Sequence, residues 1–227
     1  MKQMQFPAFA LIAFAVVLAG ANALAQDRAI TLDSKTTRTP PELTEEADVW
    51  SFSASASTYI VPDFQEYVQP TFTADRGWLH LETRYNYEDL KTGSVSIGYN
   101  FGGGEKVEWE FTPMLGGVFG NTRGVAPGYK FSLTYWKLEF SSEGEWVFDL
   151  GNSEDSFFYN WSELSISPVE WFRFGLVGQR TRAYQTDVDI QRGLLVGFSF
   201  KKIDLTTYVF NLDQGKPTWV FAVGVSF

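Results

Sequence analysis

The final segment of the chain, Pro217–Phe227, alternates strictly between large apolar and small residues. One phase holds Trp219, Phe221, Val223, Val225 and Phe227, and the other holds Thr218, Val220, Ala222, Gly224 and Ser226. A period of two is typical of a β-strand and not of a helix. A free apolar edge strand of this kind would aggregate in water. We therefore expect the sheet to close into a barrel, with lipid covering the apolar face.

The N-terminus has the order of a secretory signal peptide. Lys2 precedes an apolar run at 6–20, and Ala23 and Ala25 form an A-x-A cleavage site before Gln26. We therefore expect residues 1–25 to be a cleaved signal peptide. An uncleaved membrane helix is the alternative, because the apolar run is nearly long enough to span a bilayer.

Residues 26–47 show no usable periodicity and carry Pro40, Pro41 and a run of acidic residues. This composition predicts a flexible periplasmic N-terminal segment. The alternative is that the segment enters the barrel and plugs it. Residues 48–227 then form one outer-membrane β-barrel domain.

Composition excludes several classes of protein. The chain has no cysteine, which excludes a disulfide framework and a lipid-anchored N-terminal cysteine. The formal net charge of −9 disfavours nucleic acid as a partner. The 21 Phe, 8 Trp and 10 Tyr residues suit a sheet with aromatic girdles at two membrane interfaces.

Alternation and turn signals from residue 49 onward predict about twelve strands. The predicted ranges are 49–60, 66–74, 78–87, 94–101, 106–119, 129–140, 145–150, 157–166, 169–181, 189–201, 203–212 and 217–227. Within 129–140 the apolar phase changes at Tyr135, which we interpret as a bulge, and we place a turn at 141–144. Short connections alternate with longer ones, so both termini are expected on the periplasmic side, where such barrels have short turns.

The segment Trp219–Phe227 is similar to the C-terminal strand of bacterial outer-membrane β-barrels, which typically ends in Phe with aromatic residues on the same face. This resemblance implies an all-β, closed, antiparallel, up-and-down transmembrane barrel in the bacterial outer membrane. It also implies lipid, lipopolysaccharide and the barrel-assembly machinery as partners, the last through Trp219–Phe227. The size is similar to the channels for acidic oligosaccharides. Their lumen is rich in arginine and this one is not, so no subfamily is assigned.

The sequence contains few residues that could form a catalytic or metal-binding site. His80 is the only histidine, so a metal site built on His and Cys has no second ligand. A Ser–His lipid hydrolase remains the third reading. Glu108 and Glu110 point the same way on one strand, about 7 Å apart, but such acids are more often ion-pair partners. We expect no catalytic residue, cofactor or metal.

The residues predicted to face inward carry the functional argument. They are His80, Glu82, Arg84, Glu108, Glu110, Lys130, Lys137, Glu139, Asp149 and Arg173. Acids and bases are nearly balanced, and this charged wall faces strands whose inward residues are Ser, Gly and Ala. We interpret the chain as a porin-like channel for small solutes with a mixed-charge lumen. The alternative is a non-conducting structural or lipopolysaccharide-interacting barrel.

Three arginines stand apart from the lumen set. By phase, Arg180, Arg182 and Arg192 point outward near the extracellular rim. Arginine is costly at the middle of the membrane and cheap near its surface, where it can contact phosphates of lipopolysaccharide. The alternative is that a bulge turns them inward or into the loop.

Overall fold

The structure is a computed structural model that describes residues 49–183 and 189–227. The predicted signal peptide (1–25), the predicted periplasmic segment (26–47) and the loop 184–188 lie outside the described residues. No helix in the described ranges is both long and apolar enough to cross a membrane.

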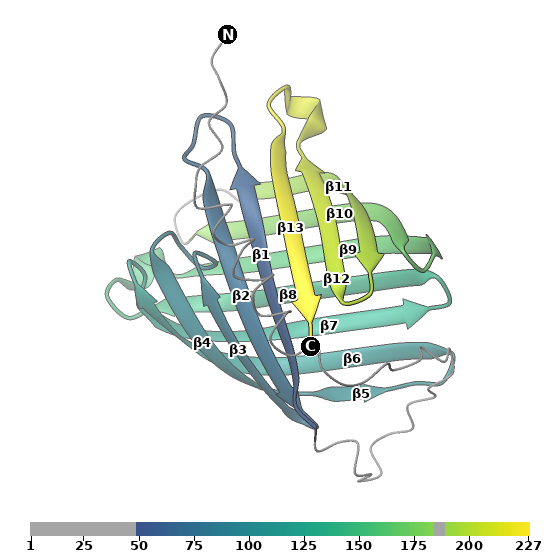
Figure 1. The fold of residues 1–227 in the computed structure, drawn as a ribbon. Helices are drawn as coiled ribbons and strands as arrows, with labels where there is room; N and C mark the ends of the chain where they lie inside the picture. Colours follow the sequence, from purple (N-terminus) through teal and green to yellow (C-terminus); the bar gives the residue numbers. More distant parts are fainter. Residues whose placement is uncertain (1–48, 184–188) are drawn as a thin grey trace.

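The described residues are almost entirely β-strand (Figure 1). Two short 3-10 turns, η2 (Ser153–Asp155) and η3 (Leu212–Gln214), lie in connections. The strands are β1 (Ser51–Ile60), β2 (Tyr67–Arg76), β3 (Leu79–Tyr85), β4 (Thr92–Tyr99), β5 (Phe101–Gly103), β6 (Val107–Gly120), β7 (Gly124–Tyr135), β8 (Leu138–Asp149), β9 (Phe157–Val169), β10 (Phe172–Ala183), β11 (Asp189–Phe200), β12 (Ile203–Phe210) and β13 (Thr218–Ser226).

The sheet closes on itself, as the C-terminal segment predicts. Every strand pairs antiparallel with its neighbours, and β13 pairs with β1 from Ser53↔Ser226 to Ile60↔Trp219. Because β4 and β5 both pair with β6 in one continuous register, they occupy a single position in the wall. The result is the predicted closed antiparallel barrel of twelve wall positions, with no free sheet edge.

The gap between β4 and β5 has a local cause. It lies opposite Pro113 of β6, which has no backbone N–H to donate to the ladder. On the side away from β6, Asn100 in the gap still donates its backbone N–H to the carbonyl of Trp78. Its side chain accepts a hydrogen bond from Thr112 Oγ1 at 2.7 Å, which keeps the two short strands in line.

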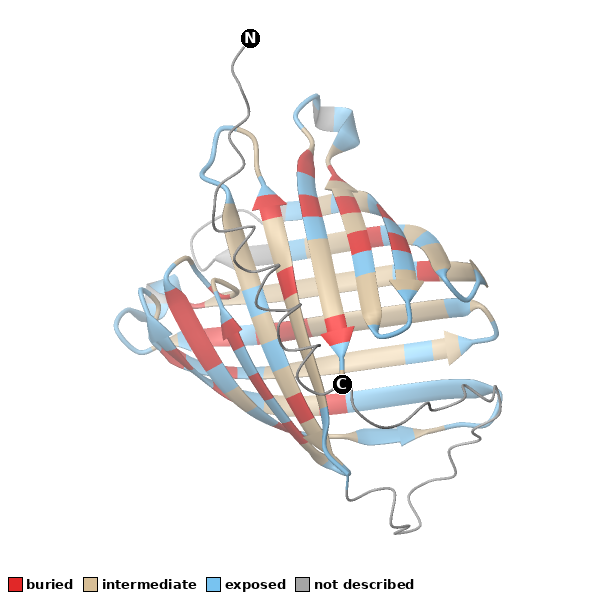
Figure 2. Ribbon diagram, viewed as in Figure 1, coloured by how far each residue is buried: buried red, intermediate tan, exposed pale blue. Residues whose placement is uncertain are grey.

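Side chains alternate between the two faces of the wall, and Figure 2 shows the resulting alternation of exposed and buried positions most clearly along β3 and the first half of β13. On β13, Trp219 and Phe221 are 40% and 45% exposed on the outer face, whereas Val220 between them is 1% exposed inside. Large apolar residues cover the outer face of the other strands in the same way. This outward apolar band is what a barrel in lipid requires.

Connections differ between the two ends of the barrel. The end with the tight turns, here called the turn end, also holds both described chain termini, where Phe52 and Phe227 exchange two backbone hydrogen bonds of 2.9 Å. The opposite end, here called the loop end, carries most of the longer connections, including 61–66, 86–91, 150–156 and 211–217.

The predicted strands 129–140 and 145–150 are wrong. The chain forms β7 and β8 there, joined by a tight turn at Trp136 and Lys137, and Trp136 has a φ of 57°. The phase change at Tyr135 therefore marks a turn and not a bulge, and the predicted turn at 141–144 lies within β8. The predicted turn at Ser167 and Pro168 likewise lies within β9.

Candidate functional site: the barrel lumen

Glu82 is the centre of the polar groups inside the barrel. It lies on β3 between His80 and Arg84, and all three side chains point inward and are buried. Its carboxylate accepts hydrogen bonds from Arg84 Nε and from Lys130 Nζ of β7, and His80 Nε2 lies 3.6 Å away. A carboxylate that is 3% exposed is stable in its charged form only with such partners.

The network continues toward the turn end through His80, Asp75 and Asn100. His80 Nδ1 lies 2.7 Å from Asp75 Oδ1 on β2, and Asn100 donates to the same oxygen at 2.9 Å. With the bond from Thr112 to Asn100, this gives an unbroken hydrogen-bonded wall over β2, β3 and β6. Inside a barrel, such connected groups fix one another's orientation.

On the other side, Arg84 reaches across the lumen to β8. Its guanidinium lies 3.5 Å from Glu143 and 3.8 Å from Glu145. In the barrel order, β4, β6 and β7 separate β3 from β8, so these contacts cross the interior and not a neighbouring ladder. Asp75, His80, Glu82, Arg84, Lys130, Glu143 and Glu145 are called the lumen charge network below.

The connection 86–91 also enters the lumen. The Tyr87 hydroxyl donates to Glu143 Oε1 at 2.6 Å, and the Arg84 guanidinium lies 3.9 Å from the Tyr87 ring centroid. The same ring meets Tyr159 of β9 edge-on at 5.2 Å. Tyr87 therefore narrows the lumen on the loop side of the network.

A second polar group lies on the wall formed by β9, β10 and β12. Arg173 contacts Glu163 at 3.6 Å, Asp204 at 3.3 Å and Thr206 Oγ1 at 2.7 Å. Glu163 also accepts hydrogen bonds of 2.8 Å from Trp161 and from the Tyr208 hydroxyl. Arg173 is therefore held by acids and is not an open anion-binding group.

Two further features complete the inner surface. Near the loop end an apolar cluster lines the lumen, and it consists of Tyr59, Val177, Leu195, Tyr208, Phe210 and Val220 with Tyr67 and Trp161 packed against them. Where β1 meets β13, the inward residues from the turn end up to Ser57 and Ala222 are small, and Tyr59 and Val220 follow toward the loop end. The small residues, called the small-residue wall below, are Ser51, Ser53, Ser55, Ser57, Ala222, Gly224 and Ser226.

The predicted site residues fall into three groups. His80, Glu82, Arg84 and Lys130 meet in one network, and Arg173 lies in the second group. Inward positions nearer the turn end hold Glu108, Glu110 and Glu139. The other two differ from the prediction. Lys137 lies in the β7–β8 turn and donates to the Pro168 carbonyl, and Asp149 accepts backbone N–H bonds from Gly151 and Asn152 at the loop end.

Sequence reasoning missed several inward groups, namely Asp75, Tyr87, Glu143, Glu145, Glu163 and Asp204. The signal for Glu143 and Glu145 was present, because Trp146 and Phe148 continue the outward phase that starts at Leu138. With these residues added, inward carboxylates outnumber the inward cations Arg84, Lys130 and Arg173 among the described residues. The lumen is therefore richer in acids than the near balance predicted.

The outward arginines keep the predicted phase where they are described. Arg180 and Arg192 are exposed on the outer face of β10 and β11, and the side chain of Arg182 lies outside the described part. Over the described residues, no group of three or more His, Cys, Asp or Glu side chains is arranged to hold a metal ion.

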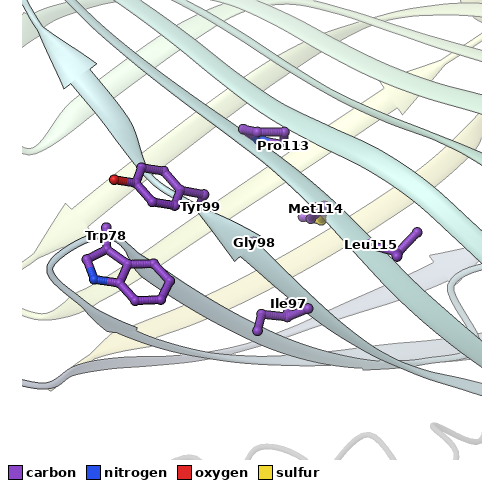
Figure 3. A pocket seen from close by; sticks show the side chains of 7 residues that line it. All are labelled: Trp78, Ile97, Gly98, Tyr99, Pro113, Met114 and Leu115. Atoms are coloured by element: carbon purple, nitrogen blue, oxygen red, sulfur yellow. The ribbon is translucent and has the colours of Figure 1, made fainter.

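A shallow hollow on the outer face is not a candidate site. It lies between β4 and β6 and is lined mainly by Trp78, Ile97, Tyr99, Pro113 and Leu115 (Figure 3). These side chains belong to the outward, lipid-facing band and bring no set of polar groups together. Acyl chains would cover such a surface.

No protein-family model and no curated protein matches the chain. Similar solved structures include KdgM porin, with a TM-score of 0.53 and 10% identity over 77% of this chain and 99% of that one. KdgM porin in complex with disordered oligogalacturonate gives 0.50 and 10% over 78% and 98%. NanC porin gives 0.50 and 12% over 78% and 98%. At these identities the similarity shows the fold, which is that of bacterial outer-membrane porin barrels.

Proposed function

We propose that the chain is a small-solute channel of the bacterial outer membrane, with the loop end outward and both described termini in the periplasm. One observation carries the proposal: a hydrogen-bonded charge network lines the inside of a barrel with the porin fold. A barrel that served only as a scaffold could fill its interior with apolar side chains, which cost less to bury than charges. Recognition of Trp219–Phe227 by the barrel-assembly machinery stays a prediction.

The charges also suggest the class of solute. Over the part of the chain that the structure describes, inward acids outnumber inward bases, and both Arg84 and Arg173 already contact carboxylates. Anions therefore find no open cluster of guanidinium groups, whereas cations and neutral polar solutes meet acceptors along the wall. We propose that the preferred solutes are small and cationic or neutral, unlike the oligogalacturonate named with KdgM porin.

A specific observation favours a second candidate, a barrel that does not conduct. Arg84 and Tyr87 contact Glu143 from the far side of the lumen, and Tyr87 contacts Tyr159. These contacts reduce the cross-section that remains open beside the small-residue wall. Plugging by residues 26–47 would act in the same direction.

Single-channel recording in a planar bilayer distinguishes the two candidates. Refolded protein should give discrete conductance steps, and a salt gradient should give a reversal potential of cationic sign. Glu143→Gln should shift the reversal potential toward zero, and Tyr87→Ala should raise the conductance by removing the ring that narrows the lumen. Silence from a folded sample, confirmed by its heat-modifiable gel mobility, contradicts the channel and favours the closed barrel.

A further inference from the structure

Gly178 leaves an open position on the outer face of β10. It lies in the outward phase with Leu176, which is 58% exposed, and a Cβ built on Gly178 meets no atom within 4 Å. Its cross-strand neighbours are Ser162 of β9 and Arg192 of β11, and Arg180 is the next outward residue on the same strand. Two guanidinium groups and a hydroxyl therefore border a hollow that no side chain fills.

Among the described residues, neither arginine at this hollow has a carboxylate partner. In the described part of the chain, no carboxylate lies within ion-pair distance of Arg180 or Arg192, whereas Arg84 and Arg173 inside the barrel contact acids. Both lie near the loop end, because β10 ends at Ala183 and β11 begins at Asp189. At that depth an outward arginine reaches the headgroup layer. Unpaired guanidinium groups facing that layer are suited to phosphate, which they bind in bidentate fashion.

A polar surface continues from the hollow into the lipid-facing band. Tyr129, Ser142, Asn160 and Ser162, here called the outer polar stripe, lie on the outward face of β7, β8 and β9. Asn160 Nδ2 donates to Ser142 Oγ at 3.1 Å and to the Tyr129 hydroxyl at 3.0 Å, and Ser162 Oγ donates to Asn160 Oδ1 at 3.0 Å. These internal bonds reduce the cost of facing lipid.

The stripe is adjacent to the arginines through the sheet register. Asn160 pairs with Arg180, and Ser162 pairs with Gly178. From the arginines near the loop end, the stripe descends to Ser142, in the middle of β8. Leu164 and Leu176 bound it on the turn side with exposed apolar side chains. The whole surface is thus cationic at the headgroup level and hydrogen-bonding just below it.

We propose that this surface binds the phosphorylated end of one lipopolysaccharide molecule. Its phosphates pair with Arg180 and Arg192 over the Gly178 hollow. The ester and amide groups that join its acyl chains to the sugars lie against the outer polar stripe. The charge of the two arginines favours this occupant over a second copy of the chain, because the described residues of the surface include no self-complementary acid. The site rests on the proposed orientation of the barrel and not on conduction.

Retention of lipopolysaccharide by the full refolded chain tests the site. The protein is mixed with phosphorylated lipopolysaccharide or with the same material after dephosphorylation, and bound lipid is measured after size-exclusion chromatography in detergent. Wild-type protein should retain the phosphorylated form and not the other. The Arg180→Gln/Arg192→Gln variant should retain at least tenfold less. Gly178→Leu should weaken retention with both charges present, since it fills the hollow.

Arg123→Gln serves as the matched control, because it removes an exposed loop-end cation away from the hollow and should leave retention unchanged. Excess inorganic phosphate should not displace the lipid, because the outer polar stripe also contributes to binding. Displacement by phosphate alone would contradict the role of the stripe. Equal retention by the double variant, or equal retention of dephosphorylated lipid, overturns the proposal. So does a dimer, seen by native mass spectrometry, that the same variants dissociate while lipid retention stays constant. A bilayer recording without conductance steps would contradict the channel but would not change lipid retention. Failure of one proposal is therefore distinguishable from failure of the other.

Discussion

At the scale of single residues, Glu82 shows how the lumen tolerates buried charge. Its carboxylate contacts two cations, Arg84 and Lys130, and the ring of His80 lies nearby. Removal of one partner from such a group costs much more than the pair contributes, because the remaining charges lose their compensation inside the barrel. Glu82 therefore determines the positions of the side chains around it.

We expect Glu82→Gln to lower the free energy of unfolding by about 3 kcal/mol, since the buried Arg84 and the half-buried Lys130 would then lie beside a neutral amide. Urea unfolding of the protein in lipid vesicles, followed by tryptophan fluorescence, measures the change. Glu108→Gln is the control, because Glu108 is exposed near the turn end and its replacement should cost less than about 0.5 kcal/mol. Equal losses for the two variants would show that the network does not stabilise the barrel.

At the scale of elements, most of the fold could be predicted from alternation, because a strand with one face in lipid must repeat every two residues. The prediction failed where two strands meet in a turn that carries no glycine or proline. Trp136 and Lys137 are followed by further apolar and charged residues of the kind found in strands. In the sequence, the phase change at this turn therefore resembles a bulge within one long strand. The chain reverses where Trp136 adopts a backbone φ of 57°. A tryptophan rarely has a positive φ, so its residue type does not predict a turn at this position.

The connection 86–91 is an element whose packing we expect to depend on pH. Asn86 holds the connection to β2. Its side-chain Nδ2 donates to the backbone carbonyl of Val68 at 2.9 Å, and its backbone carbonyl accepts a hydrogen bond from Gln69 Nε2 at 2.8 Å. Glu88 is 9% exposed, and burial raises the pKa of its carboxyl group. At a pH between the ordinary pKa of a glutamate and the raised pKa of buried Glu88, this carboxyl group is protonated when the connection is packed. It is ionised when the connection is released into solvent. Packing of the connection is therefore favoured at low pH and weakened as pH rises.

We expect trypsin to cleave after Lys91, an exposed residue at the end of this connection, faster at pH 8 than at pH 5 relative to the Glu88→Gln variant. The neutral amide cannot ionise, so the variant should keep the connection packed at both values. Comparing the two proteins at each pH removes the pH dependence of the protease itself. A ratio of cleavage rates that stays constant with pH would exclude Glu88 as the titrating group.

At the scale of the whole molecule, the lumen is asymmetric. One side carries the lumen charge network and the other the small-residue wall, and this contrast could be predicted from the alternating serines of β1 and the small residues of β13. The contacts of Arg84 and Tyr87 with Glu143 could not, because alternation assigns a side chain to a face and not to a partner across the barrel. We infer that an open path would follow the small-residue wall.

That location predicts which substitution closes the path. A Cβ built on Gly224 has Ser55 Cβ at 3.9 Å and Asp204 Cβ at 4.0 Å as its nearest atoms, so a side chain fits there without strain and projects into the lumen. Gly224→Trp should lower single-channel conductance at least twofold, because an indole fills a large part of a narrow aqueous cross-section. Gly117→Trp is the matched control, since Gly117 lies on the outer face of β6 with no atom within 4 Å of its built Cβ. It adds the same ring on the lipid side, and its conductance should equal that of the wild type. Unchanged conductance in Gly224→Trp, or equal losses in both variants, would place the conducting path away from the small-residue wall.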